Sequence, residues 1–292
     1  MKKKELIGIS SLLSAAFLYG FFGILTRTLG FSLPLFYAMW TRGIVCVGIL
    51  GALLLWTKQW RPIKNADWKW FILRSCGGLV GYIGSYISFY YIPIGTAYFI
   101  FYGAVAIGGY ILGSIFFRER LSLLRVVSLV LAIIGLGFIY TLNVYSGSTI
   151  YVLLAMASGF WTAIWNTSSK KLSGSYTALQ LNYTDFLLGL VAHFTLSLIL
   201  REPWIPISLN IVWLVNLLFV VMFLSTGQLI VYGFQRLDAQ IGSLVMLTEV
   251  VFGTVLSYIF FHEILTPLTI VGGVFILCAI IIPEVRWKKS LF

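Results

Sequence analysis

The feature that most constrains this chain is a series of continuous apolar runs, each roughly 20 residues long, separated by short clusters of charge. At ~1.5 Å rise per residue, a helix of that length crosses the ~30 Å hydrocarbon core of a bilayer. The runs are continuous rather than alternating, which favours helices over barrel strands. We therefore expect an all-α integral membrane protein with ten transmembrane helices. The expected spans are 6–26, 35–56, 70–92, 96–117, 122–141, 149–168, 178–200, 211–233, 240–261 and 265–283.

The basic residues indicate topology rather than a nucleic-acid partner. The net charge is +11, but Lys and Arg flank the apolar runs instead of forming a solvated basic domain, so no nucleic acid is expected. If the amino terminus is cytoplasmic, seventeen of the twenty basic residues, Arg74 among them, lie on the cytoplasmic side. Both termini are then expected in the cytoplasm, and the chain in the inner (plasma) membrane of a bacterium.

The chain repeats itself at about half its length. A Phe-Phe-x-Glu-x-Leu block at 116–121 recurs at 260–265, which places Glu119 and Glu263 144 positions apart. Each half has five crossings, and an odd number forces the halves into opposite orientations. We expect an inverted repeat divided at 1–143 and 144–292, together forming one transport domain. Such repeats place a site near midplane and support alternating access, so transport is the leading function.

These motifs resemble those of the drug/metabolite transporter superfamily, specifically its EamA-type members with ten helices. The resemblance rests on the two Phe-Phe-x-Glu-x-Leu blocks, on Pro34 with Arg42, and on the run 247–250 around Glu249. In the family this last motif commonly reads Glu-Pro-Val. Val250 stands where that proline would be, which predicts a straighter ninth helix. The resemblance implies a secondary transporter, often an exporter, of amino acids, amines or other small metabolites.

Three charged residues, Arg42, Asp185 and Glu249, lie clearly within the expected spans, where a charge costs roughly 2.5–3.5 kcal/mol on insertion scales. Glu249 is near midplane and is the strongest site candidate, either as a proton carrier or as a partner for a cationic substrate group. The alternative is a structural ion pair with Arg42. Arg42 itself could bind a substrate carboxylate or only fix a helix end. Asp185 is expected at a shallower depth in the membrane than Glu249. It could act in transport, or it could only stabilise the fold.

Aromatic residues supply a candidate cavity wall. Tyr82 and Tyr86 are four residues apart and share one helical face, and Tyr98 and Tyr102 repeat this spacing in the next span. Inward-pointing rings would offer hydroxyl groups and cation–π contacts. Trp165 is a further candidate. Packing is the alternative for Tyr82 and Tyr86, and an aromatic belt at the membrane interface is the alternative for Tyr98. Trp165 has the same ambiguity.

Two polar residues complete the candidate set. Asn166 is an amide in an apolar span and would prefer a cavity to lipid. His193 lies eight positions after Asp185 on a broadly similar face, but a lone histidine is more often a hydrogen-bonded packing residue. Separately, Gly77 with Gly81 and Gly109 with Gly113 have the spacing that allows close helix packing.

Other functional classes have less support. No P-loop, metal-ligand spacing or converging catalytic cluster is evident, so we expect neither an enzyme nor a bound cofactor or metal. A channel lacks a filter-like loop or charge ring, and a lipid-translocating or structural role stays an alternative. The expected partners are the lipid bilayer and a zwitterionic or cationic small molecule. Proton coupling and a homodimer remain open.

Overall fold

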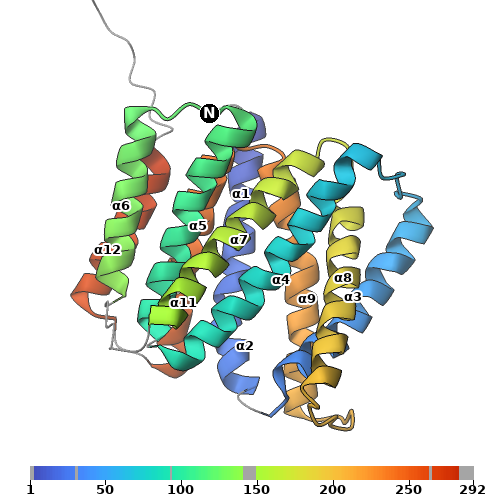
Figure 1. Ribbon diagram of the computed structural model, residues 1–292. Coiled ribbons are helices and arrows are strands. Elements are labelled where there is room, and N and C mark those ends of the chain that lie inside the picture. Colours follow the sequence, from blue (N-terminus) through green and yellow to red (C-terminus); the bar gives the residue numbers. More distant parts are fainter. Residues whose placement is uncertain (1–2, 30–31, 93, 141–148, 263–264, 283–292) are drawn as a thin grey trace, which may run out of the picture.

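The ten expected spans form helices in the computed structural model, which describes residues 3–29, 32–92, 94–140, 149–262 and 265–282 (Figure 1). Eight spans are single helices, and the first and ninth are each divided in two. In the described residues the helices are α1 (Lys3–Gly20), α2 (Phe22–Leu29), α3 (Leu35–Thr57), α4 (Trp68–Tyr91), α5 (Ile94–Phe117), α6 (Leu123–Ile139), α7 (Thr149–Leu172), α8 (Ala178–Ile199), α9 (Ile211–Phe234), α10 (Ala239–Met246), α11 (Thr248–Phe261) and α12 (Pro267–Ile281), with a 3-10 turn at Asn65–Asp67.

The helices have the length and surface of a membrane protein. Six helical stretches are long and apolar enough to cross a bilayer, and α6 and α12 are shorter apolar helices. Large apolar side chains are exposed around the bundle, for example Leu123 on α6, Ile199 on α8 and Leu268 on α12. Lipid is the environment in which such side chains are not destabilising. The expected class, an all-α integral membrane protein with ten transmembrane helices, is confirmed.

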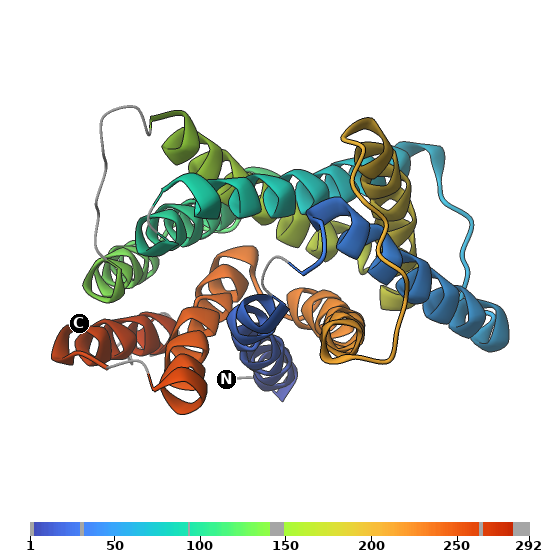
Figure 2. The ribbon, with the colours of Figure 1, turned by 90° about the horizontal axis from the view of Figure 1, so that it is seen from below.

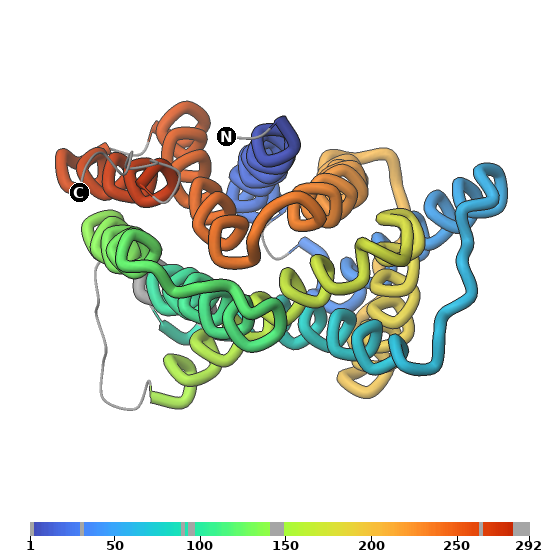
Figure 3. The backbone as a smooth tube through the Cα atoms, turned by 90° about the horizontal axis from the view of Figure 1, so that it is seen from above, coloured from blue at the N-terminus to red at the C-terminus, as the bar shows by residue number. Residues whose placement is uncertain are grey.

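The packing follows the inverted repeat. Helix α7 packs on α4 and α5, and its counterpart α1 packs in the same way on α9 and α11. Two further pairs, α3 with α8 and α6 with α12, each join equivalent helices of the two halves. Figures 2 and 3 show the result as two layers, one containing α4, α5 and α7 and the other α1, α9, α10 and α11. The expected boundary at 143/144 falls outside the described residues.

The ninth span is broken at Leu247, so the prediction of a straighter helix is wrong. Leu247 N donates to the Leu244 carbonyl at 3.0 Å, and Val250 N donates to the Leu247 carbonyl at 3.1 Å. These bonds span three residues instead of four, and they tighten the turn. The Thr248 hydroxyl also donates to a backbone carbonyl one turn back, which competes with the regular ladder. A proline is therefore not needed for the break.

Glycine allows the closest helix contacts. A Cβ atom on Gly135 of α6 would lie 2.7 Å from the Gly272 carbonyl oxygen of α12. On α4, a Cβ atom on Gly77 would lie 2.7 Å from the Trp161 carbonyl oxygen, and one on Gly81 would lie 3.2 Å from a carbonyl of α7. Side chains larger than hydrogen would force these helices apart. The close packing predicted at Gly77 and Gly81 is confirmed.

Two linkers fasten α3 and α8 at opposite ends of the bundle. Gln180 near the start of α8 donates to the Arg61 carbonyl at 2.6 Å and accepts from Arg61 N at 3.1 Å. At the other end, Glu202 accepts from Phe36 N at 3.0 Å and Tyr37 N at 2.6 Å, capping the start of α3. Each linker belongs to one half and holds a helix of the other.

The charge bias and the inverted repeat predict that Glu119 and Glu263 face opposite sides of the membrane. Single cysteines placed beside each glutamate, in a protein lacking Cys46, Cys76 and Cys278, should react with impermeant maleimide from opposite sides. The measurement is labelling of right-side-out and inverted vesicles. Labelling of both positions from one side would contradict the inverted topology.

Candidate functional site

A cavity of about 290 Å³ lies between the two layers. Its wall includes residues of α1, α3, α4, α5, α7, α8, α9, α10 and α11, and therefore of both halves. The polar and aromatic residues of this wall include Arg42, Tyr82, Tyr98, Tyr102, Trp165, Asn166, Asn182, Asp185, His193 and Glu249. The position of the cavity agrees with the usual site of inverted-repeat transporters, at the interface of the repeats.

Glu249 lies at the helix break in the middle of the ninth span. Its carboxylate accepts a hydrogen bond from the Tyr102 hydroxyl of α5 at 2.7 Å. The Tyr102 ring stacks on Tyr98, with the ring centroids 5.7 Å apart, and both rings line the cavity. Glu249 is also in the first turn of α11, where the partial positive charge of the helix terminus favours a carboxylate. In the described residues no ion pair involves Glu249.

A second polar centre surrounds Arg42, toward the side at which α3 begins. The Nε atom of Arg42 donates to the Asn216 amide oxygen of α9, and the Asn216 amide donates to Thr41 at 3.2 Å. The guanidinium lies 3.8 Å above the centre of the Phe219 ring. Only 4% of Arg42 is exposed. The expected alternative, an ion pair between Arg42 and Glu249, is absent among the described residues.

A third polar centre surrounds Asp185, toward the side at which α4 and α8 begin. Arg74 forms an ion pair with Asp185 across a distance of 2.9 Å. The same carboxylate accepts hydrogen bonds from Ser75 at 2.7 Å and from the Trp165 indole at 2.9 Å. Arg74 also donates to Asn182 at 2.9 Å. Asp185 therefore has a full set of partners within the protein.

Arg74 lies inside the helix bundle, which differs from its expected position among the cytoplasmic charges. Its position near the start of a span predicts a cytoplasmic charge that sets topology, but its side chain is fully buried, with 0% exposed. A guanidinium at that depth needs a counter-charge, and Asp185 supplies it. Arg74 thus belongs with Arg42, Asp185 and Glu249 among the charges inside the bundle.

The remaining expected residues divide into two groups. Tyr82, Trp165, Asn166 and His193 line the cavity with the charged residues. Tyr86 is not in the wall, although its ring stacks on Tyr82 with the centroids 6.5 Å apart. The spacing of four residues correctly placed the two rings side by side, but only the first of them reaches the cavity.

The EamA-like transporter family matches residues 6–141 and, a second time, residues 149–283. This chain belongs to that family. The double match corresponds to the two halves, and it makes the protein a transporter of the drug/metabolite type. A solved structure titled "Crystal structure of protein" has a TM-score of 0.76 with this transporter at 17% identity, covering 97% of this chain and 98% of that one. That likeness shows the fold alone. No curated protein matches the chain.

Two site residues of this transporter escaped the sequence analysis. Asn216 and Asn182 are amides within apolar spans, and their side chains meet Arg42 and Arg74 respectively. A signal was present, because an amide at membrane depth needs a hydrogen-bond partner just as Asn166 does. Asn182 also precedes Asp185 by three positions, which places both on one helical face.

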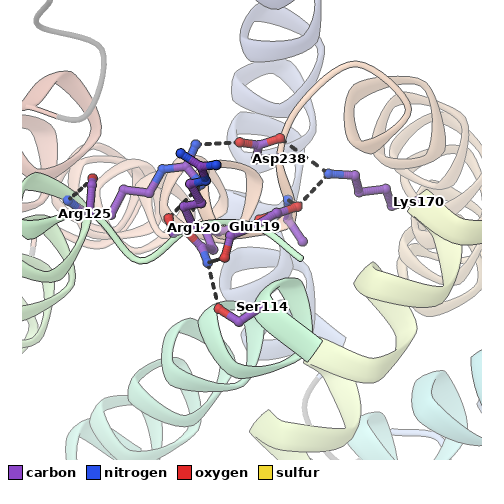
Figure 4. A network of polar contacts seen from close by, with 9 residues as sticks. Ser114, Glu119, Arg120, Arg125, Lys170 and Asp238 are labelled. Carbon is purple, nitrogen blue, oxygen red and sulfur yellow. Dashed lines mark hydrogen bonds and ion pairs between the residues drawn. The ribbon is translucent and has the colours of Figure 1, made fainter. Parts of the chain in front are cut away.

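A polar network ties the two halves of the transporter together on the side where α10 begins (Figure 4). Glu119 accepts from the backbone N–H groups of Ala239 at 2.7 Å and Gln240 at 3.0 Å, and from Lys170 at 2.6 Å. Only 4% of the Glu119 side chain is exposed. The neighbouring Asp238 is an ion-pair partner of both Arg125, on α6, and Lys170, on α7. A carboxylate from the first half thus caps a helix of the second.

Lys170 and Lys171 provide a matched test of this network. Lys170 contacts Glu119, whereas Lys171 is exposed and lies 5.9 Å from the Trp70 ring. Lys170→Gln should loosen the contact between the halves, because Glu119 loses its only cationic partner in the described residues. A cysteine replacing the buried Ser243 of α10 should then react several-fold faster with maleimide. Lys171→Gln is the control, and equal labelling rates in both variants would contradict a holding role for Lys170.

Proposed function

We propose that this protein is a secondary transporter, working as an exporter, that moves zwitterionic or cationic small metabolites by alternating access coupled to protons. Amino acids and amines are the favoured substrates. The observation that carries the proposal is Glu249, a mid-membrane carboxylate in the cavity wall whose hydrogen bond comes from an uncharged phenol. Such a group can take up a proton or a substrate ammonium, and the two would compete for it.

The aromatic wall supports the same substrate class. Tyr82, Tyr98, Tyr102 and Trp165 all line the same cavity as Glu249. Ring faces attract cations, by roughly 0.5–2 kcal/mol each. A cationic or zwitterionic molecule would therefore find both a carboxylate and several ring faces in one cavity. Sugars and sugar phosphates have no cationic group that could pair with the Glu249 carboxylate.

The proposed mechanism is a rocking motion of the two halves around the cavity. Its support is the inverted packing of α1 and α7 and the position of the cavity between the layers. The Glu119 network would hold one side closed while the other side opens. We assign that side to the cytoplasm of a bacterial cell, on the basis of the Lys and Arg bias.

The test combines a binding screen with a flux assay. Purified protein is first screened for thermal stabilisation by amino acids, amines, sugars and sugar phosphates, because a ligand that binds the native state raises its stability. Compounds that bind are then followed in proteoliposomes with and without an imposed pH gradient. We expect gradient-dependent flux of amino acids or amines. Flux of sugar phosphates alone, or flux that ignores the gradient, would contradict the proposal.

A further inference from the structure

The two arginine centres occupy equivalent positions in the two halves. Asp185 lies 143 positions after Arg42, and each is the eighth residue of its helix, α8 and α3 respectively. The partner helices correspond as well, since Asn216 of α9 lies 142 positions after Arg74 of α4. One centre joins α3 to α9 and the other joins α8 to α4. The inverted repeat therefore places a polar pair at equivalent positions twice, once toward each side of the membrane, with the guanidinium on opposite members of the two helix pairs.

The two centres differ in their charges. The centre on α8 and α4 pairs the Arg74 guanidinium with the Asp185 carboxylate. The centre on α3 and α9 pairs the Arg42 guanidinium with the neutral amide of Asn216. Within the described ranges Arg42 has no acidic side chain at ion-pair distance, and Glu249, the acidic residue of the same cavity wall, bonds to Tyr102 instead.

A buried guanidinium without an anion is costly, and what surrounds Arg42 compensates only in part. The Phe219 ring face offers a cation–π contact at 3.8 Å, and the Tyr82 phenol lies beside the guanidinium. Neither group carries a formal negative charge. Arg42 also lines the cavity, so a molecule inside the cavity can reach it.

We propose that Arg42 is the carboxylate-binding subsite of the transported molecule. The substrate carboxylate takes the place beside Arg42 that Asp185 occupies beside Arg74. The planar guanidinium can donate two parallel hydrogen bonds to a carboxylate while its Nε stays on Asn216. This inference rests on the proposed function and narrows it. The substrate is a zwitterion, with its carboxylate on Arg42 and its ammonium toward Glu249.

The first test compares molecules that differ only by the carboxylate. Each proteinogenic amino acid is tested beside the amine left when its carboxyl group is removed, using thermal shift and titration calorimetry. At least one amino acid should bind wild type about tenfold or more tightly than its amine, as expected for charge-assisted bidentate bonds. Arg42→Gln should remove that preference and leave amine binding within a few-fold. Arg42→Lys should restore only part of it.

The second test adds a stability measurement that needs no ligand. Asn216→Asp places a carboxylate directly beside Arg42, so it should raise Tm by a few degrees and abolish the preference for carboxylates. Asn210→Asp is the matched control, because Asn210 is an exposed N-cap on the same helix, where Asn and Asp are equivalent. The control should leave both quantities unchanged.

These outcomes separate the subsite from the proposed function. If Asn216→Asp leaves Tm unchanged or lowers it, Arg42 already has its counter-charge and the subsite assignment is wrong. If no carboxylate binds better than its amine, or if Arg42→Gln keeps the preference, the assignment is also wrong, even where Glu249-dependent flux of amines persists. Conversely, a carboxylate preference that depends on Arg42 in a protein without pH-driven flux would uphold the subsite and overturn proton coupling.

Discussion

Glu249→Gln is expected to reduce pH-gradient-driven transport to the level of protein-free liposomes while the protein stays folded. Glutamine has nearly the same shape, and its amide oxygen can still accept the hydrogen bond from Tyr102, which is 2.7 Å from the carboxylate in the native protein. It cannot bind and release a proton, however. Folding and membrane insertion should therefore survive, and only the step that uses the proton gradient should fail.

The measurement is flux in proteoliposomes under an imposed pH gradient, with Tm recorded for every variant. Glu249→Asp should retain partial activity, because a shorter carboxylate still titrates but reaches Tyr102 less well. Substrate exchange without a gradient provides a second readout that requires no net proton movement. If well-folded Glu249→Gln protein transports like wild type under a gradient, Glu249 is not the coupling residue and Asp185 becomes the next candidate.

Asp185→Asn should have the largest effect on stability among the site variants. It removes the anion from a fully buried Arg74, whose guanidinium lies 2.9 Å from Asp185. Breaking a buried pair in this way costs about 3–5 kcal/mol, because the remaining charge is left uncompensated. Ser75 and Trp165 would also donate to a weaker acceptor.

The decisive comparison is a double-mutant cycle with Arg74→Gln, measured by unfolding in one detergent. The double variant Arg74→Gln/Asp185→Asn contains no unpaired charge, so it should be more stable than either single variant. Ser75→Ala serves as a control that removes one hydrogen bond and leaves the charges in place. Additive losses across the cycle would show that the ion pair does not account for the effect.

The membrane class, the number of spans and the inverted repeat could be predicted from the sequence because each depends on local quantities. The length of an apolar run and the position of Lys and Arg are both readable along the chain. The break at Leu247 could not be predicted, since the proline that usually marks such a break is missing. The break depends on which carbonyl groups accept hydrogen bonds from the backbone N–H groups and from the Thr248 hydroxyl. That pairing is set by the folded structure and cannot be read along the chain.

The site was predictable in its charges but not in their pairing. A charge within an apolar run is conspicuous, so Arg42, Asp185 and Glu249 could be chosen from the sequence. Their partners lie on helices far away along the chain, and nothing local indicates them. Arg74 was misassigned for the same reason: it is close enough to the start of its span to resemble a topological charge, and only the fold brings Asp185 to it.

The unequal arginine centres have a consequence for the energy of the empty transporter. In a perfect inverted repeat, the states open to either side would be related by the two-fold symmetry and would have equal free energy. The unloaded protein would then divide evenly between them. In this chain Arg42 stands where the other half has Asp185, and Asn216 stands where it has Arg74. The degeneracy is therefore lifted. The unloaded protein is expected to favour one state, and the two unequal pairs of side chains contribute to that resting bias.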